Sequence, residues 1–166
     1  MGLMAPLAGK SAAPPTATEA GIFVEISGTG IDPRTIQAYL ETHYRIEGAE
    51  PVNLRVGVQS PTLARIHKEY NVSCSAFITP CNPFSQLLSD DENHARCMAL
   101  AHELDEEGYS YLEGIGQHSS NGWIGEKSYL VFGLTLDDAK ALGTRLEQNA
   151  IVWSGADAIP QLILLR

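Results

Sequence analysis

The pattern of apolar and polar residues predicts strands and helices that interleave along the chain. Residues 52–58 place valine or leucine at every second position, which is the period of a half-buried strand. Residues 74–79 are almost continuously apolar and run into Pro80, so they predict a central strand that ends in a rigid loop. The apolar stretch at 22–26 predicts an edge strand before the turn-forming residues 27–30.

Four segments have helical spacing behind a residue that can cap a helix. Asp32 and Ser60 are each followed by proline, which loses no hydrogen bond at the first helical position. Residues 89–92 (SDDE) predict a capping box, and Thr135 predicts a cap for a last helix that ends near Leu146. The inner face of the first helix is predicted to comprise Ile36, Tyr39, Leu40 and His43.

The second half of the chain predicts two hairpins. Strands at 109–115 and 127–134 flank a long glycine-rich loop at 116–126, and residues 150–153 and 161–165 form a final pair. The whole pattern predicts a single α+β domain at 21–166, with a mixed sheet of about five to seven strands and three or four helices. Residues 1–20 are rich in alanine and proline without a period, which predicts a flexible tail.

Composition limits the classes of function. A length of 166 residues fits one domain, and the formal net charge of −9 disfavours binding to nucleic acid or to anionic membrane surfaces. The basic residues are scattered and form no run. The sequence has neither a signal-peptide pattern nor an apolar stretch of membrane-span length, so we expect a cytoplasmic protein.

The cysteines and histidines predict neither a metal site nor a disulfide framework. The 3 cysteines contain no CxxC pair, and the 5 histidines have no HxH, HxxxH or HExxH spacing. Cys81 is the one candidate nucleophile by position, whereas Cys74 and Cys97 are predicted to be small core residues. Nucleotide and cofactor motifs are also missing, so we expect no metal and no cofactor.

Polar residues that could form a binding site begin in the loop after the predicted central strand. Two prolines restrict the backbone around Asn82, which follows Thr79 in this loop. Asn93 and Arg96 lie one turn apart at the start of the next helix, where the guanidinium would suit a carboxylate or phosphate. A structural interpretation stays open for each, with Asn82 satisfying loop amides and Arg96 pairing with a nearby glutamate.

The glycine-rich loop at 116–126 contains the densest group of polar residues. Glycines flank Trp123, which is predicted to act as a lid or, alternatively, as an anchor that holds the loop to the core. Glu126 is the candidate general base, with an ordinary salt bridge as the alternative. Ser128 follows it in the strand, and Asn149 lies at another junction between helix and strand.

Several motifs together resemble a bacterial family known as domain of unknown function 3293. The motifs are IDPRTIQAYLETHYRI at 31–46, AFITPCNP at 76–83, NHAR at 93–96, GEKS at 125–128 and QNAIVW at 148–153. The resemblance covers about residues 32–166 and implies a single domain without a known activity, cofactor or partner. It also implies that some polar residues occupy motif positions, namely Asn82, Asn93, Arg96, Glu126, Ser128 and Asn149.

Three functions therefore remain open from the sequence. The first is a module that binds a small polar or anionic ligand, and the second is a metal-independent hydrolase or transferase with Glu126 as base. The third is a protein-interaction adaptor in which Trp123 and the acidic surface contact a partner. The sequence leaves the ligand and the oligomeric state undetermined.

Overall fold

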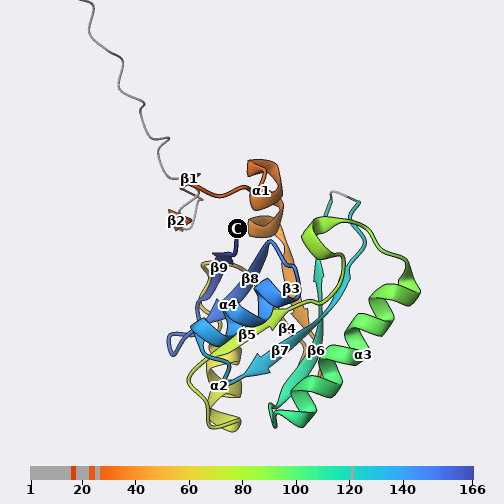
Figure 1. Ribbon diagram of the computed structural model, residues 1–166. Coiled ribbons are helices and arrows are strands. Elements are labelled where there is room, and N and C mark those ends of the chain that lie inside the picture. Colours follow the sequence, from red (N-terminus) through yellow and green to blue (C-terminus); the bar gives the residue numbers. More distant parts are fainter. Residues whose placement is uncertain (1–15, 18–22, 25–26, 121) are drawn as a thin grey trace, which may run out of the picture.

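The computed structural model describes residues 16–17, 23–24, 27–120 and 122–166. Its main feature is a curled seven-stranded sheet with the strand order β4-β3-β6-β7-β5-β8-β9 (Figure 1). The strands are β3 (His43–Ile46), β4 (Val52–Leu54), β5 (Ser75–Ile78), β6 (Tyr111–Gln117), β7 (Glu126–Phe132), β8 (Ala150–Ser154) and β9 (Pro160–Leu164). The α+β class is confirmed, but all pairings between these described strands are antiparallel, so the sheet is not mixed.

A separate two-stranded ladder precedes the main sheet. It pairs β1 (Thr16–Ala17) with β2 (Phe23–Val24). The strand expected at 22–26 is thus present at its centre, although it joins this ladder and not the edge of the main sheet. Apart from β1, the predicted tail at 1–20 lies outside the described residues.

The helices begin where the capping residues predict. Asp32 accepts a hydrogen bond from the amide of Arg34 at 2.7 Å, and the capping box between Ser89 and Glu92 is formed in both directions. Thr135 caps the last helix. The α-helices in the described ranges are α1 (Pro33–Glu41), α2 (Pro61–Glu69), α3 (Asp90–Glu106) and α4 (Leu136–Arg145), and a 3-10 turn, η1 (Pro83–Ser85), follows β5.

The structure corrects two element boundaries. His43 was predicted on the inner face of the first helix, but α1 ends at Glu41 because Thr42 is extended, and His43 begins β3. The strand predicted at 52–58 ends at Leu54, before a turn in which Gly57 has a φ of 78°. The sequence pattern missed β3 because the strand follows the helix after a single residue.

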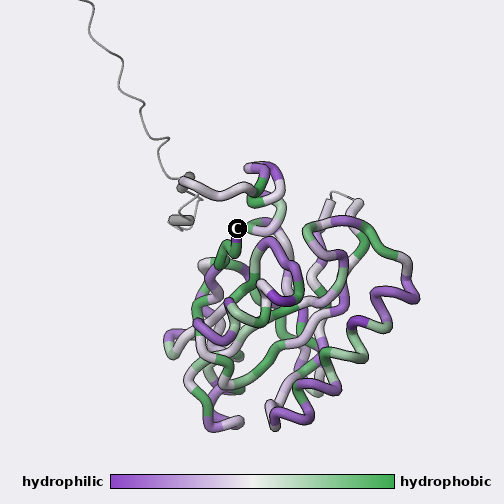
Figure 2. The backbone as a smooth tube through the Cα atoms, viewed as in Figure 1, coloured by the Kyte–Doolittle hydropathy of each residue, from purple (hydrophilic) through white to green (hydrophobic). Residues whose placement is uncertain are grey.

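Alternate residues of each central strand belong to two separate cores. Helices α1 and α2 cover one face of the sheet, and α3 and α4 cover the other. Figure 2 shows the hydrophobic residues gathered on the strands between these helices. Under α1 and α2 lie Phe77, Leu130, Phe132 and Val152, and under α3 and α4 lie Ala76, Ile78, Tyr129, Val131 and Ile151.

Candidate functional site

One face of β7 changes from apolar to polar along its length. The side chains of Phe132 and Leu130 pack in the core beneath α1 and α2, and the next two residues on this face are Ser128 and Glu126. Opposite Glu126, β6 contributes Gly116, which has no side chain. At this end of the sheet the strands therefore leave space and supply polar groups.

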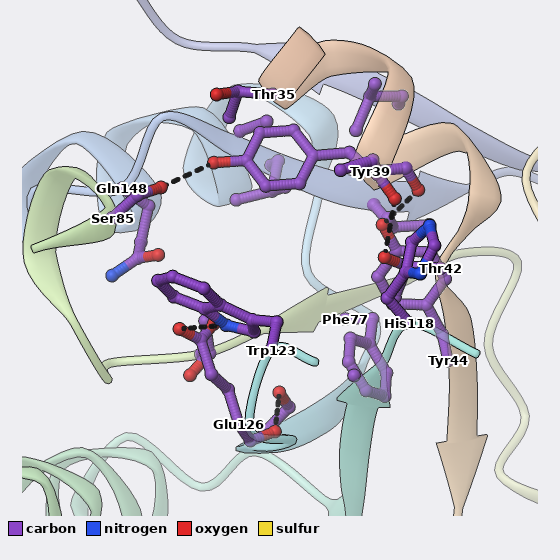
Figure 3. A pocket seen from close by; sticks show the side chains of 18 of the residues that line it. Thr35, Tyr39, Thr42, Tyr44, Phe77, Ser85, His118, Trp123, Glu126 and Gln148 are labelled. Carbon is purple, nitrogen blue, oxygen red and sulfur yellow. Dashed lines mark hydrogen bonds between the residues drawn. The ribbon is translucent and has the colours of Figure 1, made fainter. Parts of the chain in front are cut away.

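This space is a cavity of ≈ 320 Å³, a volume within the range of small-molecule sites. It lies at the end of the sheet where α1, the tip of the β6–β7 hairpin and the segment after β5 come together (Figures 1 and 3). The wall includes residues from each of these three regions. The cavity therefore joins parts of the chain that are far apart in sequence.

Aromatic rings form much of the wall. Tyr39 from α1 and Trp123 from the β6–β7 loop face one another across the open space in Figure 3. Deeper in the cavity, Tyr44 and Phe77 meet edge to face with their centroids 5.2 Å apart. The hydroxyl of Tyr44 donates to the carbonyl of Tyr39 at 2.8 Å. A flat or apolar ligand would find ring surfaces on opposite sides.

Glu126 provides a half-buried carboxylate in the wall, with two donors on the same oxygen. Its Oε1 accepts a hydrogen bond from Nδ2 of Asn82 at 2.8 Å and from Nε1 of Trp123 at 3.3 Å. Within the described residues, Oε2 has no hydrogen-bond donor. Burial raises the pKa of Glu126, and the bonds from Asn82 and Trp123 act in the opposite direction. One carboxylate oxygen thus remains for a ligand.

Asn82 is buried and held by a reciprocal amide pair. Its Oδ1 accepts from Nδ2 of Asn93 at 2.9 Å, and its backbone amide donates to Oδ1 of Asn93 at 3.0 Å. The same Oδ1 also accepts from the amide of Leu88 at 3.0 Å. These contacts fix Asn82 in a left-handed conformation with a φ of 47°, which asparagine adopts more readily than most residues. The side-chain Nδ2 of Asn82 thereby points toward Glu126.

The adjacent turn η1 contains unusual backbone conformations. Phe84 and Ser85 have φ values of 51° and 59°, and such conformations in residues other than glycine often accompany functional sites. Ser85 lines the cavity and shares a 2.9 Å hydrogen bond with the hydroxyl of Tyr39. Asn149 donates to both hydroxyls, at 3.1 Å to Ser85 and 3.2 Å to Tyr39. Asn149 thus supports the wall from behind.

The structure places Arg96 away from the cavity. Its Nε donates to the carbonyl of Pro80 at 2.6 Å, and Nη2 donates to the carbonyl of Leu146 at 3.0 Å. The guanidinium predicted to meet an anion instead ties the loop after β5 to the end of α4. Among the residues predicted from the sequence, those that line the cavity are Thr79, Asn82, Trp123, Glu126 and Ser128, and those that do not are Asn93, Arg96 and Asn149.

Residues 78–151 match the model of a family described as Protein of unknown function (DUF3293). The resemblance to this family is confirmed over that segment. The match runs from the end of β5 into β8, so it contains Asn82, Glu126 and the loops around them. No curated protein and no solved structure matches the chain. The function is therefore unknown from comparison.

The cavity also contains residues that lie outside the DUF3293 segment and that the sequence pattern did not reveal. Helix α1 contributes Arg34, Thr35 and Tyr39, although the helical spacing suggested only a core role for Tyr39. Within the matched segment, His118 from the loop predicted at 116–126 also lines the cavity, and its Nε2 lies 2.9 Å from Oε2 of Glu41. The sequence carried only a weak signal for the α1 part of the wall, namely the two polar residues Arg34 and Thr35 in the first turn of an amphipathic helix.

The described residues contain no group of three or more His, Cys, Asp or Glu side chains arranged to hold a metal ion. None of the described helices combines the length and the apolar character that a membrane span requires.

Proposed function

We propose that this protein binds a small molecule that has an aromatic or apolar body and a hydrogen-bond donor. The observation that carries this proposal is the carboxylate of Glu126 in the cavity wall, with Oε1 held by two donors and Oε2 without one in the described structure. An ammonium or amide group of a ligand would supply the missing donor, and a charged donor would give the stronger bond.

The distribution of charge favours a cationic or neutral donor over the anionic ligand expected from the sequence. The guanidinium of Arg96 is engaged by two backbone carbonyls, and the chain has a formal net charge of −9. The ring faces of Tyr39 and Trp123 also attract cations. Arg34 lies exposed on α1 and is the position from which an anion would be attracted.

Two probes with the same ring and opposite charge test this proposal. Phenethylamine carries an ammonium group, and phenylacetate carries a carboxylate. We expect phenethylamine to raise the melting temperature and phenylacetate to have a much smaller effect, since a ligand stabilises the folded state in proportion to its occupancy. Binding of phenylacetate alone would contradict the donor proposal and favour an anion site at Arg34.

Three variants locate the binding. Glu126→Gln should remove the preference for the amine over the carboxylate. Gly116→Leu should weaken the binding of both probes, because a side chain at this position extends into the cavity. Glu113→Gln is the matched control, since this exposed residue of the same hairpin contacts Lys127 and not the cavity. Amine binding that persists unchanged in Glu126→Gln would overturn the assignment.

A catalytic role for Glu126 is a second candidate. Burial raises the pKa of Glu126, and a carboxylate with a raised pKa takes up a proton more readily than an ordinary glutamate. A metal-independent hydrolase or transferase would then use Glu126 as base, with Asn82 holding the carboxylate in place. Turnover of a ligand found in the probe screen, abolished in Glu126→Gln while binding of neutral analogues persists, would support this function.

A further inference from the structure

Two cysteines meet in the core beneath α3, behind the cavity wall. Sγ of Cys81, in the loop after β5, lies 3.5 Å from Sγ of Cys97 on α3, and the two residues are 16 positions apart in sequence. Both side chains are buried. The remaining cysteine, Cys74, lies before β5 and donates to the carbonyl of Leu134 at 3.3 Å. The sulfur atoms of Cys81 and Cys97 are therefore in contact without a covalent bond between them.

We propose that Cys81 and Cys97 form an oxidisable pair that peroxide converts into an intramolecular disulfide. A disulfide has a sulfur–sulfur distance of about 2.05 Å, so the two atoms must approach by roughly 1.5 Å. We expect rotation of the two side chains, together with a small shift of the loop, to supply this approach. The inference is independent of the ligand proposed for the cavity.

The loop is already held against its partner helix. The carbonyl of Pro80 accepts from Arg96, the residue before Cys97, and the amide of Asn82 donates to Asn93. On the other side, Nε2 of Gln148 donates to the carbonyl of Cys81 at 3.0 Å. Backbone groups on three successive residues are thus fixed by side chains, two of which belong to α3. The fold consequently holds the two thiols close to one another.

The environments of the two thiols assign them different chemical roles. The hydrogen bond with Cys97 lowers the pKa of Cys81, with further help from Thr79, whereas the same bond and burial raise the pKa of Cys97. Because the thiolate is the nucleophile, Cys81 is the sulfur that reacts first. Thr79 and Asn82 line the cavity, so the cavity borders the loop that carries Cys81.

The reaction balances with one peroxide molecule. The Cys81 thiolate attacks a peroxide oxygen, the O–O bond breaks, and a sulfenic acid forms as hydroxide leaves and takes a proton to become water. The Cys97 sulfur then attacks the Cys81 sulfur, forming the S–S bond as the S–O bond breaks and a second water leaves. Two electrons pass from the thiols to the peroxide, and the two thiol protons end in the two water molecules.

Tryptic mapping tests the pair in a Cys74→Ser background. Trypsin cleaves after Lys68, Arg96 and Lys127, so Cys81 falls in peptide 69–96 and Cys97 in peptide 97–127. Cys74 shares the first peptide, and its substitution removes the ambiguity. After peroxide treatment and alkylation of free thiols, we expect these two peptides to be linked until a reductant is added. In wild type, the free thiols should fall from three to one because two are consumed.

A comparison of folded and unfolded protein controls for accidental oxidation. In concentrated urea the contact between the two sulfur atoms is lost, so the linked peptides should form at least several times more slowly than in buffer. Equal rates in urea and in buffer would overturn the proposal without the need for a core substitution. Peptides that remain unlinked in folded Cys74→Ser, or a Cys81 that stops at the sulfinic acid, would overturn it as well.

Discussion

The two faces of the central sheet use the same strands in different ways. Beneath α3 and α4, the one polar group that β7 places deep in the core is the hydroxyl of Tyr129, which donates to the carbonyl of Cys97 at 3.1 Å. On the opposite face, the same strand carries Glu126, whose Oε2 has no donor in the described structure. A strand built only for stability would satisfy both groups internally. This difference between the two faces is the reason why we propose a ligand on the α1 face.

The largest expected effect comes from removing a side chain on the filled face. Leu100 on α3 is 2% exposed, and Leu100→Ala should lower the free energy of unfolding by about 3 kcal/mol because it leaves a new cavity. Leu162 borders the existing cavity and is 8% exposed, so Leu162→Ala should cost clearly less. Urea unfolding of both variants measures this contrast. Equal losses would show that the two faces are equally well packed.

A smaller loss should follow when a side chain is added at Gly114 of β6. A Cβ there would lie 2.5 Å from the carbonyl oxygen of Arg45 and 2.8 Å from the ring of Phe77. Overpacking of this kind costs about 2 kcal/mol, so Gly114→Ala should unfold at a lower urea concentration than wild type. An unchanged midpoint would mean that the strands can separate to make room. Gly114 would then be no more tightly packed than Gly116, which borders the cavity.

The third effect is a dependence of stability on pH that belongs to Glu126. Its pKa is raised in the folded protein, so its protonated form contributes stability that is fully present below the ordinary glutamate pKa and is lost as pH rises through the folded value. The stability of wild type relative to Glu126→Gln should therefore fall as the pH rises above about 4, the ordinary glutamate value. Chemical unfolding at several pH values gives the difference. A constant difference would mean that the hydrogen bonds from Asn82 and Trp123 offset the effect of burial, and a rising difference would mean that they outweigh it.

Local signals predicted much of the fold, and contacts between distant residues account for what they missed. The caps at Asp32 and Thr135 depend on neighbouring residues, so the sequence located the starts of both helices correctly. Asn82 and Glu126 are 44 positions apart, and their hydrogen bond has no local pattern. The sequence also could not show which groups accept hydrogen bonds from Arg96. Both acceptors are backbone carbonyls, which every residue has, so no residue type indicates them.

The sequence did not predict the cavity either, because the cavity also depends on contacts between residues that are distant in sequence. It depends on α1 lying over β6, and on Gly116 standing opposite Glu126 where a larger residue would fill the space. In the sequence, Gly116 was merely the first residue of a glycine-rich loop. Its place inside β6 follows only from the strand pairing.

The smallest expected change in stability, at Gly116, separates a binding site from a packing defect. A Cβ there would have its nearest atom at 3.7 Å, an ordinary contact, and Gly116 has no positive φ. Gly116→Ala should therefore stabilise the protein by about 0.5 kcal/mol, since alanine loses less backbone entropy on folding. The same methyl group extends into the cavity and should weaken phenethylamine binding. A gain in stability coupled to a loss of binding is expected of a space retained for a ligand, whereas equal binding in both proteins would place the probe elsewhere.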